Sequence, residues 1–208
     1  MNFINKLQVG IKNFQQGVYE EKKSVFSSLE SQQDPKICLI TCADSRICPH
    51  VVTSTDPGEL FIIRNAGNMI PISEEGSGEI ASIEYCVEAL NVEHVIIMGH
   101  SNCGAMQGII NIDSLSLPHV CSWLKKSNIE ESYLESLKDI DDNKQRLEGL
   151  IKHNVLQQID NLKSYSFMQG KPLEFHGWVY DISKGIVEAY DFSNKDWKIL
   201  DEKSIDNI

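Results

Sequence analysis

The chain contains 208 residues, of which 41% are hydrophobic and 24% are charged, a composition typical of one globular domain. Its formal net charge of -11 argues against a nucleic acid or an anionic membrane surface as a partner. Because no run is apolar enough to span a membrane, the N-terminus lacks a signal-peptide layout and the six cysteines are irregularly spaced, we expect a single cytoplasmic domain over residues 1–208.

Residues 1–30 are predicted to form a helical arm. Apolar side chains recur there at steps of three and four, which is the pattern of an amphipathic helix with a narrow stripe. The stripe consists of Ile4, Leu7, Ile11, Phe14 and Val18. The pattern leaves two arrangements open: the arm packs on its own domain, or it reaches over a neighbouring subunit. Residues 32–35 end in Pro35 and break the helix.

Five apolar runs predict an α/β core over residues 36–190. Four of them predict strands of a mostly parallel sheet, because helical patterns separate them. These runs cover residues 37–42, 60–63, 95–98 and 173–180. Residues 186–190 follow a turn at Gly185 and predict an antiparallel edge strand.

Helices are expected to flank this sheet. Residues 76–78 open one helix, and Tyr85 lies off its apolar stripe, free to face something else. The stripe itself consists of Ile80, Ile83, Val87 and Leu90. The charged residues 125–148 predict a surface helix or loop, and the apolar spacing over residues 147–162 predicts another amphipathic helix.

Three potential metal ligands follow two of the predicted strands. Cys42 ends the first apolar run, and His100 and Cys103 follow the third. Because ligands bind at the carboxyl ends of parallel strands, we expect these side chains at one edge of the sheet. Two thiolates and an imidazole are ligands that Zn²⁺ prefers, and a free fourth position suits catalysis.

A cysteine at a strand end is otherwise most often a small apolar core residue. We give that interpretation to Cys38, Cys48, Cys86 and Cys121.

A carboxylate and a guanidinium accompany the first thiol. Asp44 and Arg46 follow Cys42 by two and four residues, so an extended exit from the strand would point all three side chains the same way. Side by side, Asp44 and Arg46 can form a two-pronged ion pair. Such a pair alone is often purely structural.

Six short segments resemble, in order and spacing, the motifs of β-class carbonic anhydrases. They are residues 42–46 (CADSR), 57–61 (PGELF), 64–68 (RNAGN), 82–85 (SIEY), 99–104 (GHSNCG) and 177–181 (GWVYD). The resemblance implies reversible hydration of CO₂ to bicarbonate and a proton by zinc-bound hydroxide, with one Zn²⁺ per chain on Cys42, His100 and Cys103. It also implies a homodimer, or a dimer of dimers, whose N-terminal arms embrace the partner.

The resemblance further implies roles around the metal. Asp44, kept ionised by Arg46, accepts a hydrogen bond from the zinc-bound hydroxide, and it becomes the fourth zinc ligand only in a closed state. A small apolar slot for CO₂ is lined, partly across the subunit boundary, by residues that match Phe61, Ala66 and Tyr85. A residue that matches Gln33 donates a hydrogen bond to a substrate oxygen.

One position departs from a bacterial subgroup of the family. That subgroup has a Trp three residues before the first thiolate, which forms an inhibitory bicarbonate site with an Arg and a late Tyr. Arg64 and Tyr180 match two of the three, but the Trp position is Leu39. With Gln33 present, the chain resembles the plant-like subgroup with a constantly open site.

Three other functions remain open. A relative that hydrolyses carbon disulfide or carbonyl sulfide would use the same zinc site. A non-catalytic interaction domain stabilised by zinc would need four protein ligands. A thiol redox protein is disfavoured, because the chain has no Cys-x-x-Cys motif.

Overall fold

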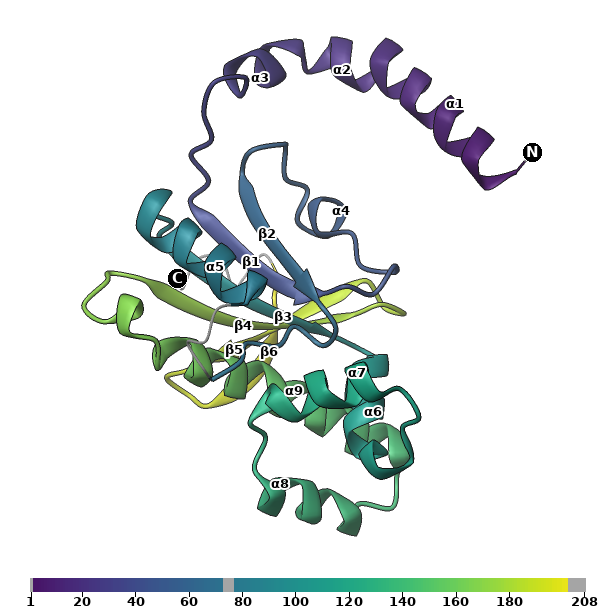
Figure 1. Cartoon of the computed structure of the whole chain (residues 1–208), viewed down its shortest axis with the longest axis vertical. Helices are drawn as coiled ribbons and strands as arrows, with labels where there is room; N and C mark the ends of the chain where they lie inside the picture. Colours follow the sequence, from purple (N-terminus) through teal and green to yellow (C-terminus); the bar gives the residue numbers. More distant parts are fainter. Residues whose placement is uncertain (1, 73–76, 202–208) are drawn as a thin grey trace.

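A six-stranded sheet forms the centre of the computed structural model, which describes residues 2–72 and 77–201 (Figure 1). Its strands are β1 (Ile37–Cys42), β2 (Leu60–Asn65), β3 (His94–His100), β4 (Glu174–Asp181), β5 (Ile186–Asp191) and β6 (Asp196–Ile199). In space they follow the order β2-β1-β3-β4-β5-β6.

The first four strands are parallel, and β5 and β6 are antiparallel to their neighbours. The predicted α/β fold with a mostly parallel sheet is confirmed. However, the edge strand is β6 rather than the predicted run 186–190, which forms β5. The sequence pattern did not reveal β6, because residues 196–199 alternate charged with apolar side chains over only four positions.

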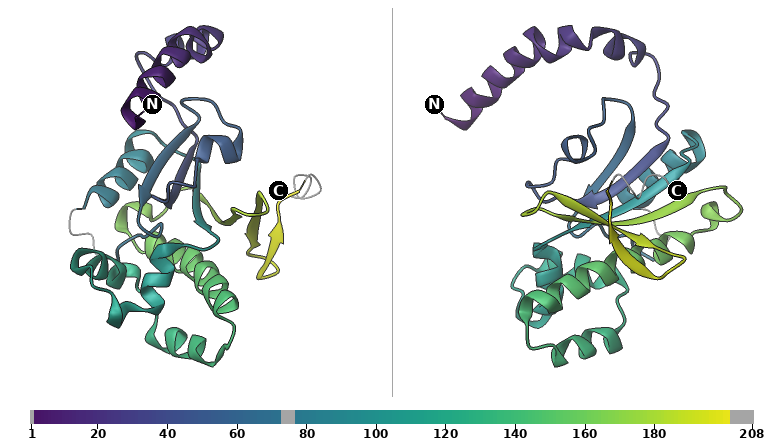
Figure 2. Two further views of the ribbon diagram at one scale, coloured as in Figure 1. Left: turned by 90° about the vertical axis from the view of Figure 1, so that its right-hand side faces the viewer. Right: turned by 180° about the vertical axis from the view of Figure 1, so that it is seen from behind.

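One face of the sheet is covered by helices (Figure 2). Helix α5 (Gly78–Glu84), α6 (Gly104–Ile110) and the long α9 (Asn143–Lys163) bury their apolar sides against it. Helix α9 lies close to the strands, since a Cβ on Gly99 would lie 2.9 Å from Val155 Cγ2. The predicted helical stripes are therefore confirmed, although Gly76 lies outside the described residues.

Helix α5 continues into the π-helical turn η1 (Tyr85–Ala89). The remaining short helices are α4 (Pro49–Thr53), η2 (Ile112–Ser114), α7 (Pro118–Leu124), η3 (Lys125–Ser127), α8 (Glu131–Ser136), η4 (Leu137–Asp139) and η5 (Ser166–Met168). Residues 125–148, predicted as a surface helix or loop, form short helices joined by loops and then the first turns of α9.

The opposite face of the sheet carries a smaller cluster of buried side chains, and we call it the open face. Leu39, Ile47, Ile96 and Met98 form its centre. Near the amino ends of the parallel strands, this face carries a groove of about 850 Å³ lined by Ile96 and Trp178 among others.

The N-terminal arm extends away from the sheet (Figures 1 and 2). It comprises α1 (Phe3–Gln16), α2 (Val18–Glu21) and α3 (Lys23–Ser28), and no residue of these helices is buried. Phe3 is 86% exposed and Leu7 63% exposed. Only the end of the arm contacts its own domain, where Lys22 pairs with Asp56 and Leu29 packs against Gly58, so the apolar stripe of α1 stays exposed. No helix in the described ranges has both the length and the apolar character to cross a membrane.

Buried amide side chains on α9 hold the loop that follows β2. Asn154 Nδ2 donates to the Gly67 carbonyl (3.1 Å), and Asn161 Nδ2 donates to the Ile70 carbonyl (2.9 Å). Gln158 Oε1 accepts the Ile70 N–H at 2.6 Å. A buried backbone group without a partner costs free energy, so these amides fix the loop by satisfying its polar groups.

We expect Gln158→Leu to lower the free energy of unfolding by about 2–3 kcal/mol, because it leaves the buried Ile70 N–H without an acceptor. Urea unfolding followed by circular dichroism measures the change. Gln145→Leu is the matched control, since Gln145 is exposed near the start of the same helix. Equal stability of the two variants would show that the amide cluster does not hold the loop.

Candidate metal centre

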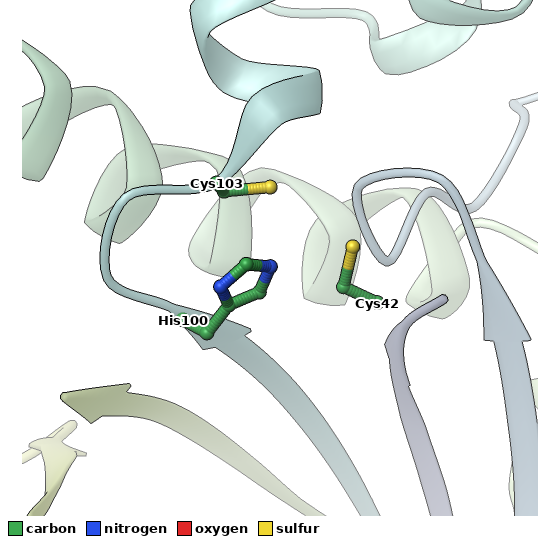
Figure 3. Close-up of side chains that lie close together, drawn as sticks. All are labelled: Cys42, His100 and Cys103. Carbon is green, nitrogen blue, oxygen red and sulfur yellow. The ribbon is translucent and has the colours of Figure 1, made fainter. Parts of the chain in front are cut away.

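Two thiols and one imidazole converge at the carboxyl ends of β1 and β3 (Figure 3). Cys42 is the last residue of β1, His100 is the last residue of β3, and Cys103 immediately precedes α6. Their potential ligand atoms all lie within 4.8 Å of one another, and all three residues are buried. The parallel pairing of β1 with β3 places the two strand ends side by side.

The imidazole of His100 is oriented as a metal ligand would be. Its Nδ1 lies 3.0 Å from the Ser101 carbonyl oxygen, and this hydrogen bond makes Nδ1 the protonated nitrogen. Its Nε2 is buried and has no hydrogen-bond partner among the described residues. Metal-binding histidines commonly donate their second ring N–H to a carbonyl in this way.

The two sulfurs are held by nearby donors. The Gly67 N–H donates to Cys42 Sγ at 3.4 Å. The hydrogen bond from Cys103 lowers the pKa of Cys42 to about 4. In turn, the hydrogen bond with Cys42, together with burial, raises the pKa of Cys103 above its usual value. The pair thus shares a proton, which a divalent cation between the sulfurs would displace.

This donor set fits a zinc ion. Two thiols and one nitrogen with an unshared lone pair are borderline-soft ligands, which Zn²⁺ prefers over the all-oxygen sets of Mg²⁺ and Ca²⁺. The cluster has three protein ligands within the described part of the chain, so the fourth tetrahedral position is left for a small molecule.

Asp44 and Arg46 form the expected two-pronged ion pair beside the cluster. Arg46 Nε lies 2.9 Å from Asp44 Oδ1, and Arg46 Nη2 lies 2.7 Å from Asp44 Oδ2. The bond from Arg46 holds the pKa of Asp44 well below its usual range. Asp44 Oδ2 is 3.9 Å from His100 Nε2, so the carboxylate faces the open side of the cluster.

The exit from β1 differs from the expected extended one. Arg46 lies in a turn, and its backbone N–H also donates to Asp44 Oδ1 at 2.9 Å. The Asp side chain folds back to bond the backbone two residues on, which is a common local competitor of extended structure. The pair nevertheless forms, because the turn itself brings the guanidinium alongside the carboxylate. A cavity of about 710 Å³ is lined by Arg46, Ser101 and Asn102 among others.

Arg64 contributes to the site in a way that its motif did not reveal. Its Nε donates to the Cys42 carbonyl at 3.1 Å, and its Nη2 donates to the Asp44 carbonyl at 2.8 Å. The guanidinium therefore fixes the segment that carries both the thiol and the carboxylate. Leu39 is fully buried in the open-face cluster, with Tyr180 packed against it.

The predicted substrate residues divide between the two ends of the sheet. Ala66 precedes Gly67 and so lies beside Cys42. Phe61 pairs with Cys38, four residues and about 13 Å before Cys42 along the strand. The ring of Tyr85 is 6.1 Å from that of Phe61. Gln33 is exposed and precedes β1. One chain therefore does not bring Gln33, Phe61 and Tyr85 to its own metal centre.

The remaining cysteines only partly follow their predicted role. Cys38 and Cys86 are buried core residues, as expected, but Cys48 is exposed and Cys121 is half-buried. The prediction was wrong for these two because Cys48 precedes a short helix outside the sheet and Cys121 lies on the surface helix α7. All six cysteines are free thiols.

Known proteins resemble this chain over nearly its whole length. The profile of a family described as carbonic anhydrase matches residues 37–187. A carbonic anhydrase of Synechococcus elongatus is 38% identical over 207 residues, which cover 96% of this chain and 76% of the relative. A carbonic anhydrase of Pseudomonas aeruginosa is 38% identical and is covered to 90%, with 93% of this chain aligned.

Solved structures share the fold. The β-carbonic anhydrase CcaA superposes with a TM-score of 0.89 at 34% identity, over 96% of this chain and 93% of that one. A tetrameric β-carbonic anhydrase of Sordaria macrospora gives a TM-score of 0.82 at 27% identity, over 91% of this chain and 97% of that one.

We expect about one tightly held divalent metal ion per chain, lost in Cys103→Ala, because removing one of three protein ligands opens the site. Elemental analysis after dialysis against a weak chelator measures the content. Cys121→Ala is the control, since that thiol lies outside the cluster. Full metal content in Cys103→Ala would contradict the assignment.

Proposed function

Because the chain belongs to the β-class carbonic anhydrases, we propose that it catalyses the reversible hydration of CO₂ with one Zn²⁺ held by Cys42, His100 and Cys103. The observation that carries this proposal is the buried, unpartnered Nε2 of His100, which faces two thiols beside an ionised carboxylate. Bound zinc would supply a nucleophile at neutral pH by lowering the pKa of water.

Asp44 is proposed to orient the attacking oxygen. A carboxylate whose two oxygens are held by Arg46 cannot rotate freely, and its low pKa keeps it an acceptor throughout the neutral range. Such an acceptor fixes the direction of an O–H bond and so aims the lone pair of that oxygen at the substrate. Arg46 acts through Asp44 and is further anchored on the Asn102 carbonyl at 3.1 Å.

We propose that each substrate slot is completed by a second copy of the chain. Ala66 belongs to the slot beside its own Cys42, whereas Gln33, Phe61 and Tyr85 lie at the amino end of the sheet. Apolar Phe61 and Tyr85 suit the non-polar CO₂ molecule, and the Gln33 amide can donate to one of its oxygens.

The exposed arm supports the same assembly. An apolar stripe that no part of its own chain buries is normally an interface. We therefore propose that residues 1–30 pack on a partner subunit, giving a dimer or a dimer of dimers. The similar β-carbonic anhydrase from Sordaria macrospora is described as tetrameric.

We further propose that the site stays open. Arg64 is committed to two backbone carbonyls, and aliphatic Leu39 fills its position in the core without an indole donor. An inhibitory bicarbonate ion would lack one wall and one hydrogen bond there. Arg46 then remains paired with Asp44, which leaves the fourth zinc position free for substrate chemistry.

We propose a single catalytic domain that works in the cytoplasm. Its six free thiols are the state that a reducing compartment maintains.

Asp44→Asn is expected to keep its metal but to lower CO₂ hydration by about 100-fold or more, because an amide cannot act as the same acceptor. Stopped-flow hydration assays, with metal analysis of the same samples, test this. Asp34→Asn is the control, an exposed carboxylate outside the cluster. Parent-like activity would refute the orienting role, and preferential turnover of carbonyl sulfide or carbon disulfide by the parent would refute the substrate.

A shared site predicts complementation between two defective chains. Asp44→Asn and Gln33→Ala each damage every site of their own homodimer, but a mixed dimer contains one site with both residues intact. Co-expression should restore about a quarter of the parent activity if subunits pair at random. Activity no higher than the mean of the two variants would show that each chain builds its own slot.

An open site predicts a gradual pH profile. Because Arg46 keeps Asp44 ionised, activity should fall with decreasing pH along a single ionisation, and bicarbonate should inhibit only as a product. Hydration rates measured across the neutral range, with and without added bicarbonate, check this. A steep loss that requires several protons would be evidence for a closed state.

A further inference from the structure

A second cluster of metal-binding side chains lies at the other end of β3. His94 begins β3, and Glu174 and His176 lie at the start of β4. In the parallel register His94 is opposite Glu174, and alternate residues of β4 share one face. The three side chains therefore gather on the open face, about 20 Å along β3 from His100.

The spacing of the ligand atoms suits a small divalent ion. His94 Nδ1 lies 3.2 Å from His176 Nε2 and 3.5 Å from Glu174 Oε2, and all three ligand atoms lie within 4.8 Å of one another. Ligands bonded to tetrahedral zinc at its usual bond lengths are about 3.4 Å apart. Adjacent strands thus hold these atoms at nearly the required separations.

The charges around this cluster also favour a cation. His94 and His176 are half-buried, and Glu174 places a carboxylate opposite His94 in the register. Lys198, a cation lining the same groove, is paired with Asp191 at 2.6 Å. The Glu174 side chain is 65% exposed, so an ion could reach the cluster from solvent.

We propose that His94, Glu174 and His176 form a second binding site, for a divalent transition-metal ion, with its remaining position open to water. Two imidazoles and one carboxylate suit Zn²⁺, Co²⁺, Ni²⁺ or Cu²⁺. The ion would tie the amino end of β3 to that of β4. Because no thiolate takes part, it would exchange more readily than the ion held by Cys42, and the proposal does not depend on the catalytic one.

The test is a Co²⁺ titration of the holoenzyme after weakly held metal has been removed by dialysis. We expect about one additional ion per chain, with visible ligand-field absorption but without a thiolate-to-metal charge-transfer band. That band without an additional ion per chain would mean that Co²⁺ had only replaced the metal at the thiolate centre, and it would overturn the proposal. Isothermal titration calorimetry gives the affinity.

His176→Ala should abolish the additional binding, and Glu174→Gln should weaken it about tenfold or more while disturbing an exposed side chain only. His119→Ala is the control, because that histidine is exposed on α7 and outside the cluster. CO₂ hydration should be unchanged in Glu174→Gln. Parent-like binding in both cluster variants, or equal loss in His119→Ala, would show adventitious surface binding and overturn the site.

Discussion

The candidate metal centre depends on the parallel pairing of β1 with β3. Thr41 lies opposite Met98 in this register, so Cys42 and His100 reach the same edge of the sheet one after the other. Cys103 then needs only a three-residue step to complete the cluster. Both strands are buried on both faces, and a slip by one residue would turn every apolar side chain toward the wrong layer. The core thereby fixes the ligand geometry.

The features predicted correctly from the sequence are those that local patterns encode. The convergence of Cys42, His100 and Cys103 could be predicted because these residues follow continuous apolar runs, and runs of that kind form buried parallel strands. The features that could not be predicted depend on partners far apart in the chain. Arg64 bonds carbonyls about twenty residues away, and the amide of Gln158 meets the Ile70 N–H across 88 positions. No periodicity marks such contacts.

The polar groups of this chain are distributed along the length of its strands. The carboxyl ends carry the thiols and Asp44, whereas the amino ends carry the polar His94, Glu174 and His176 together with the apolar Phe61. A strand of six or seven residues separates the two ends by more than a side chain can reach. This distance is the reason that one chain does not bring Phe61 and Tyr85 to its own Cys42, and the proposed shared slot and the proposed arm contact would both require a second copy of the chain.

The π-helical turn η1 connects stability with the position of Tyr85. An α-helix advances by about 100° per residue, so the widened turn changes the direction of the side chains around it. Deleting one residue within this turn would restore a regular helix and would strengthen its hydrogen bonds. The same deletion would rotate Tyr85 relative to Phe61. For the proposed substrate slot, this irregular turn would be a stability–function trade-off, because a more regular helix would move Tyr85 relative to Phe61.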